Sequence, residues 1–246
     1  MHVREEVSNE ELLKEEAASD SPFIAQEDLK DMVNVGVLFG RKKSKTQPKM
    51  NKYIFTYSKG IAIFDAPQTL DLLNKAANFL KEVLEKKLPI LIVGTQPAVK
   101  DLVKSFADKF KLAYVTERWL GGTLTNFPII SKRIEYFKKT KIDKSIGKLA
   151  KYTKKERLIL DRMLEKMAIN FTGLETLNQL PAVLIVIDSK THDTAVREAK
   201  KMNIPIIAVI NNDNNPDGIK YPIPANDNTR SSLIWILNKI ELRVNG

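Results

Sequence analysis

Short apolar runs alternate along the 246-residue chain with longer segments of helical periodicity, and this alternation is the strongest constraint on its fold. The runs at 89–93, 182–187 and 206–210 are rich in β-branched and aliphatic residues, which is typical of strands buried on both faces. Residues 97–110 and 193–202 have the length and spacing of the helices that join such strands. Because parallel strands need crossover connections, this order predicts a doubly wound α/β fold with a parallel sheet.

Further elements extend this pattern at both ends of the chain. The sequence predicts a helix over 26–35 and a β-hairpin over 53–64, whose turn contains Gly60. A helix is expected to begin near Pro67, because proline fits the first helical turn and leucines then recur at helical spacing. The remaining expected elements are strands at 112–115 and 221–223 and a closing helix at 227–242.

One segment interrupts the alternation. About 65 residues separate the strands expected near Val115 and Ala182, where a single helix would suffice. Apolar residues recur at helical spacing in two stretches of this segment, and Gly147 lies in the expected connection between them. We therefore predict an antiparallel helical hairpin over 126–178 that projects from the sheet. Its apolar positions are Ile130, Ile134 and Phe137, then Leu160, Met163 or Leu164, Met167 and Phe171.

Charge is distributed unevenly along the chain, whose formal net charge is +10. Residues 1–31 carry ten acidic and three basic side chains, whereas residues 41–52 carry six basic side chains and no acidic one. Residues 126–168 form a second basic concentration, with thirteen basic and five acidic side chains. The sequence thus predicts an acidic N-terminal extension over 1–25 and an α/β domain over 26–246. Its basic regions favour a polyanionic partner: RNA, DNA or an anionic membrane face.

Composition disfavours several classes of protein. The chain has no cysteine, which excludes disulfides and thiolate metal sites and fits a reducing compartment. No apolar run reaches the roughly 18 residues of a membrane-spanning helix. The first residues lack the apolar centre of a secretory signal. We expect a cytoplasmic protein with no membrane partner.

Parallel sheets usually bind small molecules at the carboxyl ends of their strands, where this chain places Gly94, Thr95 and Asp188. Neither the G-x-G-x-x-G nor the G-x-x-x-x-G-K-[ST] phosphate-binding pattern is present. Close packing of strand and helix explains Gly94 better, with Thr95 or Gln96 capping that helix and Asp188 capping the next one.

No catalytic site, cofactor, metal ion or small-molecule substrate is therefore expected, and the amide-rich residues 211–218 are interpreted as a solvated turn. The alternative hypothesis is a phosphate-ligand or nucleotide-binding enzyme on a flavodoxin-like, or Rossmann-like, sheet. It would need a pocket around Gly94, Thr95 and Asp188.

Residues 41–49, which we call the basic strap, have no apolar periodicity and contain a proline, which predicts an extended or looped segment. Basic side chains on such a segment can track RNA phosphates and hold position without reading bases. The alternative is a solvated charged loop. The aromatic side chains of Tyr53, Phe55 and Tyr57 follow the strap, and packing within the hairpin is preferred over stacking on unpaired bases. The candidate RNA-binding residues of the strap are Arg41, Lys42, Lys43, Lys45 and Lys49.

The lysines of the predicted helical hairpin have two interpretations that the sequence leaves open. They form either a solvated outer face or an arm that binds RNA. RNA contact is favoured near the connecting loop, where basic residues concentrate, and the candidates there are Lys138, Lys139, Lys141 and Lys144.

Residues 118–126 read R-W-L-G-G-T-L-T-N. Adjacent glycines permit backbone conformations that a Cβ forbids, and Thr125 or Asn126 can cap the helix that follows. Trp119 is expected in the core, and Arg118 is a further candidate for phosphate contact. The segment closely resembles the R-W-L-G-G-x-L-T-N signature of the ribosomal protein S-two family of the small subunit, in its bacterial form. Six further segments occur in the family's order: G-V-L-F-G at 36–40, Q-P-K-M at 47–50, I-V-G-T at 92–95, V-I-D at 186–188, N-P-D-G at 215–218 and I-P-A-N-D at 223–227.

The resemblance covers about residues 28–242 and implies a structural constituent of the small ribosomal subunit without catalytic activity. It implies binding of small-subunit ribosomal RNA, contact with neighbouring ribosomal proteins and support for ribosomal protein S-one. It also implies a coiled-coil protrusion at the position of the helical hairpin. Bacterial relatives commonly carry H-F-G-H where this chain has Leu38-Phe39-Gly40-Arg41, so an ion contact through those histidines does not transfer to this chain.

Overall fold

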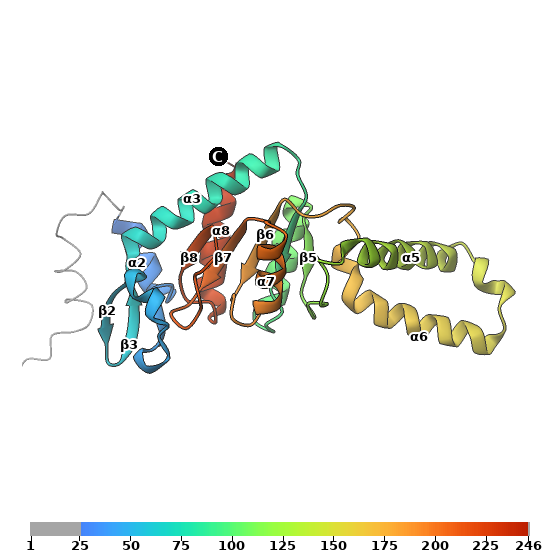
Figure 1. Ribbon diagram of the computed structural model, residues 1–246, viewed down its shortest axis with the longest axis horizontal. Coiled ribbons are helices and arrows are strands. Elements are labelled where there is room, and N and C mark those ends of the chain that lie inside the picture. Colours follow the sequence, from blue (N-terminus) through green and yellow to red (C-terminus); the bar gives the residue numbers. More distant parts are fainter. Residues whose placement is uncertain (1–25, 246) are drawn as a thin grey trace, which may run out of the picture.

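The centre of the protein is a five-stranded parallel sheet in the order β5-β4-β6-β7-β8 (Figure 1). The computed structural model describes residues 26–245, without the side chains of residues 26, 150 and 151, so the predicted acidic extension lies outside the described residues. The strands are β4 (Ile90–Val93), β5 (Ala113–Val115), β6 (Val183–Ile187), β7 (Ile206–Ile210) and β8 (Tyr221–Pro224). Every residue of β4, β6 and β7 is buried, which explains their uninterrupted apolar sequences. The predicted α/β fold with a parallel sheet is confirmed.

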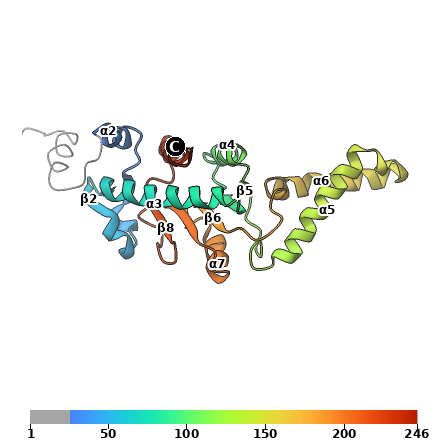
Figure 2. The same ribbon diagram turned by 90° about the horizontal axis from the view of Figure 1, so that it is seen from above.

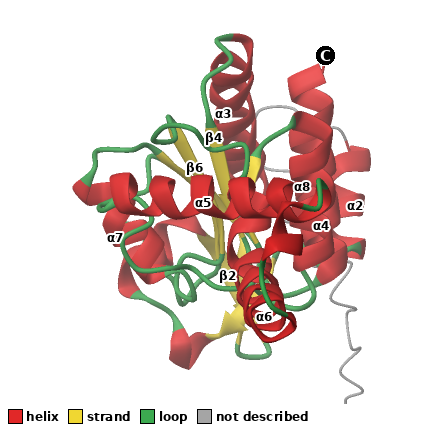
Figure 3. Cartoon of the chain, turned by 90° about the vertical axis from the view of Figure 1, so that its right-hand side faces the viewer, coloured by secondary structure: helices red, strands yellow, loops and turns green. Residues whose placement is uncertain are grey.

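Helices cover both faces of this sheet, as Figures 2 and 3 show. Helices α4 (Lys100–Phe110) and α8 (Arg230–Asn245) lie on one face, and α7 (Asp193–Lys201) lies on the other. Helix α3 (Ala66–Glu85) packs against α8 and β8. Helix α8 begins later than predicted because the Asn226 side chain accepts hydrogen bonds from the amides of Asn228 and Thr229, which form a turn before the helix.

A smaller antiparallel sheet precedes the parallel one and follows helix α2 (Gln26–Asn34). Its strands are β1 (Phe39–Lys42), β2 (Ile54–Ser58) and β3 (Ile61–Phe64), in the order β1-β3-β2. The predicted hairpin is confirmed as β2 and β3, whose turn places Lys59 and Gly60 at positive φ, as tight hairpins require.

The basic strap is less irregular than predicted. Arg41 and Lys42 are extended, but they belong to β1, which pairs with β3. The rest of the strap contains the 3-10 helix η1 (Lys43–Lys45) and the start of η2 (Pro48–Tyr53). The sequence did not predict this strand because its side chains are polar and lack a strand pattern. The strand is held by backbone hydrogen bonds to β3, which lies later in the chain.

Helices α5 (Phe127–Ser145) and α6 (Lys154–Phe171) project from the β5 edge of the sheet (Figure 1). The 3-10 helix η3 (Lys148–Lys151) lies between them. Phe137 and Phe171 pack across the pair, with ring centroids 6.4 Å apart. Leu164 is buried and Met163 is partly exposed, so Leu164 is the inward residue that the sequence left undecided. Two packed helices therefore occupy the segment where the sequence predicted a helical hairpin.

Candidate nucleic-acid interface

The R-W-L-G-G-T-L-T-N segment is organised by a buried carboxylate on α7. Glu198 is only 8% exposed and lies next to this segment. Its Oε1 accepts hydrogen bonds from the Trp119 indole at 3.0 Å and from the Gly122 amide at 2.9 Å. Its Oε2 accepts from the amides of Leu124 at 2.9 Å and Thr125 at 3.2 Å, and from the Thr125 hydroxyl at 3.3 Å. Gly122 adopts a φ of +87°, which brings its amide toward the carboxylate and favours glycine there.

Burial disfavours the charged form of Glu198, but the hydrogen bonds from Trp119, Leu124, Gly122 and Thr125 outweigh it and lower the pKa of the carboxyl group. The structure corrects the predicted capping of α5. Asn126 occupies the cap position without a capping hydrogen bond from its side chain, and Thr125 donates to Glu198 instead.

Sequence reasoning missed Glu198. Its position in the sequence could have revealed it. Glu198 comes three residues after Ala195 and directly before Ala199, on the buried face of α7, and a charged residue on a buried face needs a partner inside the protein.

Arg118 is exposed beside this turn, whereas Trp119 is partly buried and packs against the core, as predicted. Arg118 lines an open cavity of about 520 Å³ near the C-terminal end of α6. Lys100 and Lys104 line the same cavity, and Lys100 pairs with Glu117 at 2.5 Å. The guanidinium of Arg118 is thus accessible to a phosphate.

The basic strap is held against the parallel sheet by Asn212. The Asn212 side chain accepts a hydrogen bond from the Arg41 amide at 2.6 Å and donates to the Thr46 hydroxyl at 2.8 Å. Its backbone carbonyl accepts from the Gln47 amide at 2.8 Å. Asn211, Asn212 and Asn214 are buried, so the prediction of a solvated turn over 211–218 is wrong for the first half of the segment, whereas residues 215, 217 and 218 are exposed. The amides were expected in water because the sequence does not show their partners: the strap for Asn212, Asp227 for Asn211 and Ser189 for Asn214.

Lys42, Lys43 and Lys45 project from the strap as exposed side chains. The Lys43 ammonium lies 5.0 Å from the centroid of the Tyr57 ring. Lys49 forms an exposed ion pair with Asp217. Three of the five strap candidates are therefore directed to solvent without an ion pair within the described residues.

Arg41, in contrast, is turned inward. Its Nε lies 3.1 Å from Asp213, one Nη lies 3.7 Å from Asp227, and the same Nη donates to Asn228 at 3.1 Å. Both aspartates are almost completely buried. The guanidinium therefore neutralises internal carboxylates and fixes the start of the strap.

Asp227 has no exposed surface. Burial, followed by repulsion from Asp188, raises the pKa of Asp227 to about 6, although Asn211 and Arg41 favour its ionised form. Between the ordinary value of about 3.9 and this raised value, the folded protein binds more protons than the unfolded chain, so stability falls as the pH rises.

Replacing Asp227 with asparagine is expected to remove this loss. As the pH rises from about 4.5 to about 7.5, the unsubstituted protein should lose about 2 kcal/mol of unfolding free energy that the variant keeps. Urea unfolding at both pH values measures the difference. Asp108→Asn, at an exposed position of α4, is the matched control and should show no such change. Equal pH dependence in the two variants would contradict the assignment.

The candidates on the helical hairpin lie at the opposite end of the molecule from the strap (Figure 1). Lys141 pairs with Glu175 at 2.8 Å and Lys144 pairs with Asp161 at 2.8 Å. Lys138 donates to Asn178 at 3.3 Å, and Lys139 is exposed without a partner within the described residues. Exposed ion pairs contribute only about 0–1 kcal/mol, so these lysines can exchange their partners for phosphates. The predicted residues therefore form separate basic surfaces instead of one site.

The carboxyl edge of the parallel sheet is occupied by the protein's own hydrogen bonds. A Cβ on Gly94 would lie 2.8 Å from Val103 Cγ2, so the predicted close packing at this glycine is confirmed. The Thr95 amide donates to His192 Nε2 at 3.2 Å, and the Gln96 side chain donates to Asp188 at 2.7 Å.

The predicted caps at this edge need correction. No side chain makes a capping hydrogen bond at the start of α4 or α7. Asp188 accepts from the amides of Lys190 and Thr191 and thereby closes the turn before α7. In the described part of the chain, no three histidine or acidic side chains are placed to hold a metal ion. None of the helices within residues 26–245 has the length and apolarity needed to cross a membrane.

Comparison with known proteins identifies the family of the chain. The family model of ribosomal protein S2 matches residues 32–245. Small ribosomal subunit protein uS2c of Cyanophora paradoxa is 38% identical over 212 residues, which cover 86% of this chain and 91% of the relative. Small ribosomal subunit protein uS2 of Dictyoglomus thermophilum is 40% identical over 212 residues, which cover 86% of each chain. Since the family model matches residues 32–245 and both relatives are at least 38% identical over 86% of the chain, the chain belongs to the ribosomal protein S2 family.

Proposed function

We propose that this protein is a structural constituent of the small ribosomal subunit and binds small-subunit ribosomal RNA through its basic surfaces, without catalysis. Membership of the ribosomal protein S2 family carries the proposal. The exposed lysines of the strap and of the helical hairpin lie at opposite ends of one α/β domain, which suits a protein that bridges separate RNA segments.

Each basic surface has a distinct role in this proposal. Lys42, Lys43 and Lys45 contact phosphates, while Arg41 keeps the strap in place through Asp213 and Asp227. Arg118 contacts phosphate beside the turn that Glu198 organises. The remaining proposed contacts are Lys49 of the strap and Lys138, Lys139, Lys141 and Lys144 of the helical hairpin.

The family also supports protein partners in the cytoplasmic ribosome. We infer that the chain contacts neighbouring small-subunit proteins and supports ribosomal protein S-one. The enzyme hypothesis finds no support, because the groups that it needs already have partners within the protein. The Thr95 amide donates to His192, and the Asp188 carboxylate accepts from the Gln96 side chain.

Cosedimentation tests the proposal. In extracts of its own cells, the protein is expected to sediment with small ribosomal subunits and to remain bound at moderate salt. Recovery only at the top of the gradient, under conditions where other small-subunit proteins sediment, would contradict the proposal. The enzyme hypothesis is tested by measuring the melting temperature of the protein with a panel of nucleotides. A nucleotide that binds the folded state would raise the melting temperature, and no increase is expected.

A further inference from the structure

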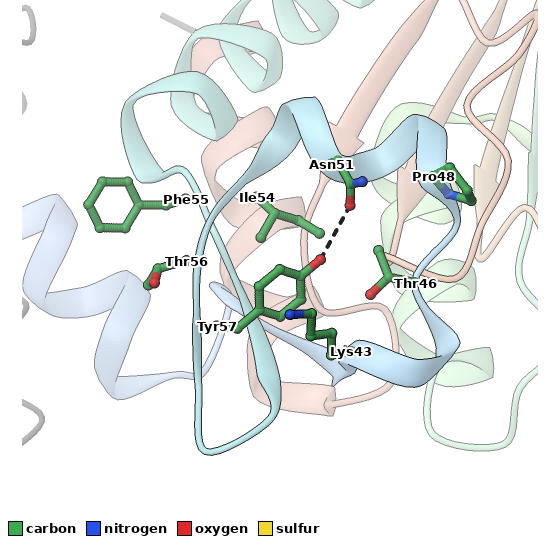
Figure 4. A pocket seen from close by; sticks show the side chains of 8 residues that line it. All are labelled: Lys43, Thr46, Pro48, Asn51, Ile54, Phe55, Thr56 and Tyr57. Atoms are coloured by element: carbon green, nitrogen blue, oxygen red, sulfur yellow. Dashed lines mark hydrogen bonds between the residues drawn. The ribbon is translucent and has the colours of Figure 1, made fainter.

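A cavity of about 330 Å³ lies beside the basic strap (Figure 4). Strand β2 contributes Tyr57, 3-10 helix η2 contributes Asn51, and the strap contributes Lys43 and Thr46. Figure 4 shows these four side chains facing one another, while the Phe55 ring points away on the other side of the strand. Ligand pockets typically measure about 300–1,000 Å³, so this cavity suits a small planar group and not an extended cofactor.

The lining of the cavity combines an aromatic ring with polar groups. Tyr57 is partly exposed, and its hydroxyl donates to Asn51 Oδ1 at 3.3 Å. This bond joins two side chains that line the cavity. Within the described part of the chain, the Asn51 amide nitrogen donates no hydrogen bond, so it can donate to a ligand. A ring face beside a polar edge is the combination that holds a nucleobase by stacking and hydrogen bonding.

Positive charge lies on the strap side of this cavity. The Lys43 ammonium lies 5.0 Å from the Tyr57 ring centroid, and Lys42 and Lys45 are exposed within two residues of Lys43 in the sequence. Residues 41–52 contain no acidic side chain. An RNA strand on the strap would therefore place phosphates near these lysines and its bases near the cavity.

We propose that this cavity receives one unpaired nucleobase of the bound ribosomal RNA, which stacks on Tyr57 and meets Asn51 at its polar edge. The inference rests on the proposed RNA binding and adds a base contact to the phosphate contacts of the strap. It also assigns Tyr57 a binding role, where the sequence favoured packing within the hairpin.

Ultraviolet cross-linking of the full-length protein to transcribed small-subunit ribosomal RNA tests the proposal without a variant. Trypsin releases residues 53–59, and mass spectrometry is expected to find a nucleotide on Tyr57 in this peptide. A cross-link at Phe55 alone, or none in this peptide while RNA is bound, would overturn the proposal. In assembled subunits, a protein cross-link at Tyr57 would identify a neighbouring protein as the occupant and would also overturn it.

Two variants separate stacking from phosphate contact. Tyr57→Leu is expected to weaken RNA affinity by about 10- to 100-fold with an unchanged salt slope, because stacking releases no counterions. Tyr57→Phe keeps the ring and should stay within a few-fold of the unsubstituted protein, and thermal melts check that both variants fold. Equal affinities of the leucine variant and the unsubstituted protein would exclude a stacked base. If the unsubstituted protein binds no ribosomal RNA, the proposed function itself fails, which is a different outcome.

Discussion

Replacing Glu198 with alanine is expected to lower the free energy of unfolding by about 4 kcal/mol, because several buried or partly buried hydrogen bonds lose their shared acceptor at once. The Trp119 indole and the amides of Gly122, Leu124 and Thr125 all point to this carboxylate. Each buried donor left without a partner costs about 1–3 kcal/mol, and local relaxation toward water recovers part of the sum. Urea unfolding followed by circular dichroism measures the loss.

Glu198→Gln separates charge from shape. It keeps one acceptor oxygen and replaces the other with a donor that faces amide donors, so a smaller loss than for alanine is expected. The matched control is Glu82→Gln on the exposed face of α3, which should change stability by less than about 0.5 kcal/mol. A Glu198→Ala variant as stable as this control would show that the carboxylate does not organise the turn.

Replacing Lys42, Lys43 and Lys45 together with glutamine is expected to weaken binding of small-subunit ribosomal RNA by about 100-fold at 0.1 M salt. The physical reason is counterion release, since each lost phosphate contact removes about 0.7–1 from the slope of log affinity against log salt. The slope should therefore fall by about 2–3, as measured by filter binding over a range of salt concentrations. Arg41 is left in place because its guanidinium pairs with buried aspartates, and its loss would disturb the fold.

The control removes the same charge from another surface. Lys81, Lys86 and Lys87 lie at the end of α3 and just after it, and their replacement by glutamine changes the net charge equally. This variant should bind with nearly the original salt slope. If both triple variants reduce the slope alike, overall charge governs binding and the strap makes no specific phosphate contact.

The sheet was predictable because its signal is local. The apolar runs of β4, β6 and β7 show strands buried on both faces, and the spacing of Ile134 and Phe137 shows an inward helix face. These patterns depend on residues that are neighbours in sequence. The exposure of lysines at the strap and on the helical hairpin follows from the same sequence, since charged side chains lie at the surface unless they are paired inside the fold.

The destinations of individual polar side chains were not predictable. Arg41 and Lys43 look alike in a basic run, yet Arg41 reaches Asp213 and Asp227 while Lys43 lies over Tyr57. Glu198 likewise resembles a surface glutamate in the sequence, and only the folded structure shows that it accepts a hydrogen bond from the Gly122 amide.

The amino-acid sequence by itself determined the parallel sheet, the projecting helices, the uneven charge and the family resemblance. Tertiary structure alone decided which charges turn inward, which strand the strap joins and where an aromatic cavity opens beside it. The physical reason is distance along the chain. Burial patterns repeat every two to four residues, whereas a carboxylate and the donors that satisfy it meet only when distant segments fold together.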